Sequence, residues 1–195
     1  TSFHKINVNN LFLTGAIVGL SPGIGYFGGL VGWGENSTFV SIKVKNPNMY
    51  FMHEDAGTIG GIVGILENST LNDCQSTGGS IVKGSGIGGL VGYLKNGEIT
   101  NSFSNIALYG DPHCAGGLIG SIYTTTQTTI KNSYTTGIIE AGGDSVGGLI
   151  GQINGMDGFE TIIINCYSTK EIEAQGNSIG GFIGEVNGEL NIENC

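Results

Sequence analysis

Positive charge is scarce in this chain of 195 residues, which contains seven lysines and no arginine. Sixteen acidic residues bring the formal net charge to −9 at pH 7. Arginine supplies the bidentate contacts that recognise phosphate, and nucleic-acid binding needs clustered positive charge. The composition therefore argues against nucleic acid and anionic lipid as partners.

Proline and long apolar runs are also rare. The chain has three prolines, and no stretch approaches the roughly 20 apolar residues of a membrane helix, so no membrane insertion is expected. The sequence starts at Thr1 without a methionine or a signal-peptide pattern, which favours a processed chain or a piece of a longer parent chain. An apolar fraction of 39% argues against disorder.

Glycine is abundant, with 37 copies, and it recurs in a block of Gly-Gly, two apolar residues and Gly. There is no Gly-X-Y period, which excludes collagen. Successive blocks start 28 to 33 residues apart, and a period in this range is typical of a solenoid. The six blocks are Gly28–Gly32, Gly60–Gly64, Gly88–Gly92, Gly116–Gly120, Gly147–Gly151 and Gly180–Gly184, and a degenerate seventh is Gly15–Gly19.

The cleanest repeat, residues 88–115, predicts the structure of one coil. Apolar segments over 88–94, 99–104 and 106–109 are separated by turn residues, and no helical period is sustained. We therefore predict an all-β protein, a parallel β-helix with about three short strands per coil of 28–33 residues and six to seven coils.

The repeat positions predict which side chains are buried. Side chains two residues apart in a strand share a face, so Leu90 and Leu94 are expected to point inward. The equivalent Leu118 and Leu149 are expected to stack with Leu90 in one buried column. Simple alternation puts the next, β-branched residue outside, so these residues either turn inward at a bend or form an exposed ridge for lateral association. They are Val31, Val63, Val91, Ile119, Ile150 and Ile183.

The whole chain, 1–195, is expected to form a single repeat domain. Residues 1–27 are an irregular N-terminal segment or cap, and residues 28–195 form the coils, of which the last is incomplete. A parallel solenoid leaves unpaired backbone groups at its ends. We expect the C-terminal edge to be covered by more of the same polypeptide or by the N-terminal end of another subunit, and the second arrangement would build a head-to-tail filament.

A second block follows each glycine block, as in Asn165-Cys166-Tyr167-Ser168. Together the two blocks resemble the GLUG-motif repeat of large surface and secreted proteins, which include adhesin-like proteins and metalloproteases that cleave immunoglobulin A. The resemblance implies a non-catalytic repeat region that is extracellular or on the cell surface. Those proteases carry a His-Glu-x-x-His zinc site, whereas His53-Glu54 lacks the second histidine here, so protease activity is not implied.

Metal and cofactor sites are not expected. His4, His53 and His113 lie in different segments, and His113 with Cys114 and Asp111 does not complete a tetrahedral zinc site. Residues 23–28 match the dinucleotide pattern G-x-G-x-x-G, but a strand repeat follows where that site needs a helix.

Acidic residues precede several glycine blocks. They are Glu54, Asp55, Asp111 and Asp144. They would bind calcium weakly if they lined up as a carboxylate ladder, but a solvated face is the preferred interpretation because the equivalent positions Ser85 and Asn177 lack an acid.

The four cysteines are expected to be small buried residues, because Cys74, Cys166 and Cys195 share a repeat position with serines. Cys166 and Cys195 fall on adjacent coils, where a disulfide is sterically allowed, although stacked free thiols are favoured. Asn36 and Asn68 begin Asn-Ser-Thr sequons in exposed turns, and they are expected to carry glycans if the protein is secreted by a eukaryote.

Two functions from different classes follow. The first is a non-enzymatic extracellular structural or adhesive region, with itself, a longer parent chain, a glycan or a host surface ligand as partner. The second is a glycan-cleaving β-helix enzyme, which requires two or three converging acids. The sequence favours the first because no acid recurs or clusters at a repeat position.

Overall fold

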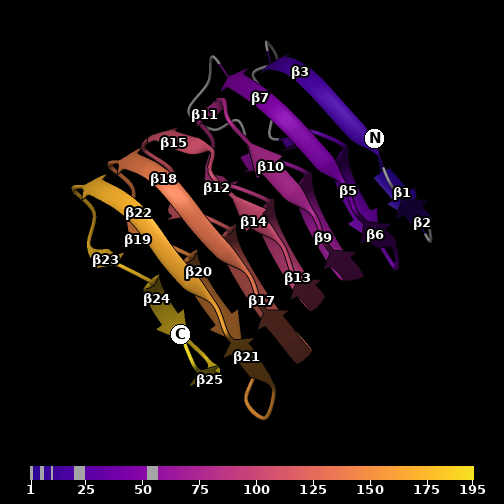
Figure 1. Ribbon diagram of the computed structural model, residues 1–195. Coiled ribbons are helices and arrows are strands. Elements are labelled where there is room, and N and C mark those ends of the chain that lie inside the picture. The colour runs from indigo at the N-terminus through magenta and orange to yellow at the C-terminus, as the bar shows by residue number, and fades with distance from the viewer. Residues whose placement is uncertain (1, 5–6, 10, 20–24, 52–56) are drawn as a thin grey trace.

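The computed structural model describes residues 2–4, 7–9, 11–19, 25–51 and 57–195. These residues form strands and no helix, and successive strands pair in parallel with their equivalents in the next coil. Figure 1 shows the strands stacked as rungs from the N-terminal end to the C-terminal end. The predicted all-β parallel solenoid is confirmed.

Three sheets run along the solenoid. Sheet A comprises β1 (Ser2–His4), β2 (Asn7–Asn9), β5 (Val31–Glu35), β6 (Thr38–Val40), β9 (Val63–Asn72), β13 (Val91–Thr100), β17 (Ile119–Lys131), β20 (Ile150–Gly155), β21 (Glu160–Ile164), β24 (Ile183–Asn187) and β25 (Glu189–Glu193). Sheet B comprises β3 (Phe12–Gly19), β7 (Lys43–Phe51), β10 (Gln75–Thr77), β11 (Ser80–Val82), β14 (Phe103–Ser104), β15 (Ala107–Gly110), β18 (Tyr134–Ala141) and β22 (Tyr167–Ala174). Sheet C comprises β4 (Gly25–Gly28), β8 (Gly57–Gly60), β12 (Gly86–Gly88), β16 (Cys114–Gly116), β19 (Ser145–Gly147) and β23 (Ser178–Gly180).

The solenoid makes about five turns with about three strands per coil. The prediction of six to seven coils is higher because it also counted the incomplete coils at the two ends. The assignment of segments to strands differs from the prediction. Residues 91–94 and 99–100 of the expected segments belong to one long strand, β13, whereas residues 103–104 form β14 in sheet B. The third side of the coil is the short strand β12.

The first and third glycines of each block let sheets A and C touch through their backbones. A Cβ atom on Gly88 would overlap the carbonyl oxygen of Val91 and would lie 2.6 Å from the amide nitrogen of Gly120. A Cβ atom on Gly92 would lie 2.8 Å from the backbone of Ile59 in β8. No side chain fits at such distances, so the coil is pinched where the two sheets meet.

A bulge at the start of β5, β9, β13, β17 and β20 turns the β-branched residues inward. The amides of Leu90 and Val91 both donate to the carbonyl of Leu118, at 2.9 and 3.1 Å, so two residues oppose one. The expectation from simple alternation is wrong for this reason. Val31, Val63, Val91, Ile119 and Ile150 are buried, and Ile183 on the last rung is half-buried, so they form no exposed ridge for lateral association.

Two apolar cores fill the solenoid. One gathers residues of sheet A and of the turn into sheet B, and the other gathers residues of sheets B and C. Leu90, Leu118 and Leu149 are fully buried in the first, as predicted. Burying each side chain stabilises the fold by roughly 1.5 to 3 kcal/mol. No helix in the described part of the chain could span a membrane.

Candidate functional site

The Asn-Ser/Cys corners are hydrogen-bonded from rung to rung. The hydroxyl of Ser102 donates to the carbonyl of Thr100 at 2.7 Å and accepts the amide of Cys74 at 3.0 Å. The residue before it, Asn101, has a left-handed backbone conformation with φ 50°. Its carboxamide oxygen accepts a hydrogen bond from the side chain of Asn132 at 3.1 Å. The corner column, which is Cys74, Ser102, Ser133, Cys166 and Cys195, therefore has a structural role.

The cysteines at the C-terminal end of this column lie one above the other. The amide of Cys166 donates to the sulfur of Cys195 at 3.3 Å, and all four cysteines are free thiols in this structure. Burial raises the pKa of Cys74, Cys114 and Cys166 to about 11. These buried thiols are therefore poor nucleophiles, and Cys195 alone is exposed.

The sequon asparagines lie at a second corner. Asn36 and Asn68 are exposed and left-handed, with φ values of 49° and 46°. The amide of Ser37 donates to the hydroxyl of Ser69 at 2.9 Å, which places the two sequons on adjacent rungs. The carboxamide oxygen of Asn68 accepts a bond from Asn96 at 3.1 Å. Glycosylation at Asn36 and Asn68 stays a prediction.

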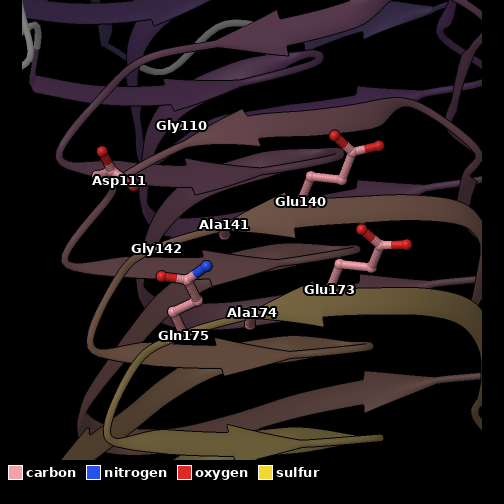
Figure 2. Close-up of a pocket in the computed structure, with 8 residues that line it drawn as sticks. All are labelled: Gly110, Asp111, Glu140, Ala141, Gly142, Glu173, Ala174 and Gln175. Carbon is pink, nitrogen blue, oxygen red and sulfur yellow. The ribbon is translucent and has the colours of Figure 1, made fainter.

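An acidic groove of about 470 Å³ lies at the edge of sheet B, where β15, β18 and β22 end. Figure 2 shows Glu140 and Glu173 on neighbouring strands with their carboxyl groups pointing the same way, and Asp111 and Gln175 on the loop side. Glu140 and Glu173 are register partners, so rung spacing holds their backbones about 4.8 Å apart. The groove is the strongest gathering of acids that we find in the described residues.

This arrangement lacks the geometry of a glycosidase pair. A catalytic pair faces across the scissile bond, with one group as acid and the other as base or nucleophile. Glu140 and Glu173 instead stand parallel on one surface, and both are exposed. The groove therefore places them side by side and does not give them two different roles.

Asp111 and Asp144 do not align as the carboxylate ladder, the less favoured interpretation of these acids, would require. The loops before β16 and β19 have equal length, so Asp111 aligns with Gly142, and Asp144 aligns with His113. Asp144 lies 3.7 Å from His113 and accepts a bond from Asn177 at 3.0 Å. Asp111 therefore belongs to a different column from Asp144, and these loops build no carboxylate site for calcium.

The remaining metal candidates give no further site. His53, Glu54 and Asp55 lie outside the described residues, and the side chain of His4 is likewise not described. Within the described part, no three His, Cys, Asp or Glu residues come together in a way that could hold a metal ion.

A buried lysine is a feature that the sequence analysis missed. Lys170 is 9% exposed, and its ammonium group donates to the carbonyl of Ile106, two coils away, at 2.5 Å. The register partner of Lys170 is Gly137, but the glycine that leaves room for the lysine stem is Gly117, where a Cβ atom would lie 2.6 Å from Cε of Lys170. Burial lowers the pKa of Lys170 to about 8.

Comparisons with known proteins found no matching family model, no matching curated protein and no matching solved structure. The structure therefore establishes the solenoid by itself, and the function has to be argued from its geometry.

The thiol column predicts graded reactivity. In the native protein under non-reducing conditions, an aromatic disulfide reagent should react rapidly with Cys195, because this thiol is exposed. The other three thiols should react slowly, because they are buried and their pKa values are raised. Denaturation should release all four. If two thiols stay unreactive after denaturation without reductant, Cys166 and Cys195 are joined in a disulfide and the free-thiol column is wrong.

Lys170 predicts a pH dependence of stability. Between pH 8 and 10.5 the unfolded chain binds more protons at this group than the folded chain does, so its contribution to the free energy of unfolding rises with pH across that window. Lys170→Met keeps the stem and removes the charge. In urea titrations the variant should be more stable near neutral pH, by up to about 3 kcal/mol, and should lack this rise. Parallel pH profiles for the two proteins would contradict a buried, desolvated ammonium.

Proposed function

We propose that this protein is a non-enzymatic structural or adhesive repeat region, related to GLUG-motif repeats, that acts outside the cell or on its surface. The observation that carries the proposal is the rung-to-rung bonding of its polar columns. The hydroxyl of Ser102, for example, makes both of its hydrogen bonds to backbone groups of the solenoid. A scaffold built in this way is suited to be a rigid rod.

Exposed apolar side chains on the last rung support the proposal that the solenoid associates end to end. Ile179, Val186 and Ile192 are 47%, 41% and 43% exposed. Their equivalents one rung earlier, Val146, Ile153 and Ile163, are fully buried. A further rung placed on this edge would bury these side chains and pair the open strands. That rung would come from another subunit or from more of the same polypeptide.

The surface chemistry supports an extracellular location. The chain is acidic, carries no arginine and displays two exposed sequon asparagines, Asn36 and Asn68. A glycan or a host surface ligand is the adhesive partner that we propose, and nucleic acid is not a partner. The parallel, exposed Glu140 and Glu173 give no specific support to the alternative of a glycan-cleaving enzyme.

End-to-end association can be tested by sedimentation velocity over a range of protein concentrations. The wild-type chain should form larger particles as its concentration rises, and Ile179→Lys or Ile192→Lys should suppress them, because each places a charge on the open rung. Met156→Lys is the matched control, since Met156 is 51% exposed but lies in the loop after β20. A wild-type chain that stays monomeric at high concentration would contradict association through the rung.

A further inference from the structure

Two columns of side chains face each other across the outer seam between sheets A and C. At one end the rings of Tyr26 and Trp33 lie 6.1 Å apart. At the other end Ser145 donates a hydrogen bond to Glu185 at 2.5 Å. The column of sheet C is Tyr26, Thr58, Gly86, Cys114, Ser145 and Ser178. The column of sheet A is Trp33, Ile65, Tyr93, Ser121, Gln152 and Glu185.

Two small residues break the repeat in the middle of this seam. Gly86 has no side chain, whereas its column neighbours are Thr58 and Cys114. Ser121 stands in the facing column next to the much larger Tyr93. The missing volume leaves a cleft of about 210 Å³ whose walls come from three consecutive coils.

Hydroxyl groups and one imidazole, that of His113, line the cleft. Thr58, Ser85 and Ser121 bring hydroxyls, which both donate and accept hydrogen bonds. Among the described residues, the hydroxyls of Thr58 and Ser85 take part in no hydrogen bond, so a ligand would not have to displace a protein partner. No lysine, aspartate or glutamate lines the cleft.

Tyr93 adds an aromatic surface beside these hydroxyl groups. Its ring is half-buried, and desolvation raises the pKa of its phenol, which therefore remains a donor at neutral pH. A tyrosine ring offers an apolar face with a polar tip. The cleft thus combines a flat apolar wall with several hydroxyl groups that can both donate and accept hydrogen bonds.

We propose that this cleft binds one uncharged sugar ring. The inference rests on the proposed adhesive function and names the ligand class for it. A sugar ring carries several hydroxyls that donate and accept, and its C–H groups form an apolar face that suits Tyr93. The cleft is smaller than the roughly 300 to 1,000 Å³ of sites for drug-sized ligands, so it takes a single ring. Among the lining residues only His113 can carry a positive charge, and it lies 3.7 Å from the acidic Asp144 in a chain of net charge −9, so an anionic ligand is disfavoured.

Saturation-transfer NMR on the intact chain tests the proposal. The probes are the methyl glycosides of glucose, galactose, mannose and N-acetylglucosamine, with glucuronate as the charged comparison. At least one neutral glycoside should receive saturation from the protein, and glucuronate should not. Gly86→Thr should abolish the transfer, because the new side chain occupies the cleft.

The variants are chosen so that the fold survives. A Cβ atom on Gly86 would lie 3.5 Å from the sulfur of Cys114, an ordinary contact, and threonine repeats the neighbour Thr58. Tyr93→Ile likewise copies its column neighbour Ile65 and should abolish the transfer by removing the ring. Gly155→Ala, whose Cβ atom would lie 3.6 Å or more from its neighbours, is the distant control and should bind as wild type does.

The absence of transfer to every neutral glycoside would overturn the sugar site. So would transfer that survives both Gly86→Thr and Tyr93→Ile in folded protein. If end-to-end association persists without sugar binding, only this inference is lost. Cleavage of a glycoside during the measurement would instead overturn the proposed non-enzymatic function.

Discussion

The close approach of sheets A and C is the constraint on which the rest of this structure depends. It is made possible by the first and third glycines of each block, which bring backbone against backbone where any side chain would collide. Because these glycines recur in every coil, the pinch is continuous along the rod. It divides the interior into two separate apolar cores and sets up the outer seam.

The glycine blocks also explain why short side chains occur inside the solenoid. The second glycine of each block faces a column of short side chains, since a Cβ atom on Gly89 would collide with the hydroxyl of Ser104. Ser76 is the member of this column above Ser104, and its hydroxyl is buried with no hydrogen-bond partner. A buried unpaired hydroxyl destabilises a fold by roughly 1 to 3 kcal/mol. The preceding coil has the apolar Val44 at this position, against Gly29, so the column accepts a side chain as large as valine.

The sequence predicted which residues stack from coil to coil better than it predicted which side chains of a strand point inward. Leu90 and Leu118 could be placed in one buried column because equal repeat positions occupy equal places in a solenoid. Val91 could not be placed, because the bulge that turns it inward depends on a shared acceptor, the carbonyl of Leu118. Strand β12 was missed because a three-residue strand with two glycines has no periodicity to detect.

The candidate sites were less predictable, because they arise between coils. The sequence analysis grouped Asp111 with Asp144, although Asp111 stands five residues before its glycine block and Asp144 stands three before its own. The register places Asp144 beside His113 instead. Lys170 is buried because its stem packs against Gly117, which lies in a glycine block of another coil. Likewise the seam cleft needs Gly86 and Ser121 together, which belong to different strands and different sheets.

The most direct test of this account compares the free energies of unfolding of Gly116→Ala and Gly155→Ala. A Cβ atom on Gly116 would overlap the carbonyl oxygen of Ile119 within the pinch, whereas one on Gly155 makes ordinary contacts. The pinch predicts that Gly116→Ala loses at least about 2 kcal/mol, while Gly155→Ala stays within about 1 kcal/mol of the wild type. Equal stability of the two variants would show that the glycine contact between sheets A and C is not what holds the coils in this shape.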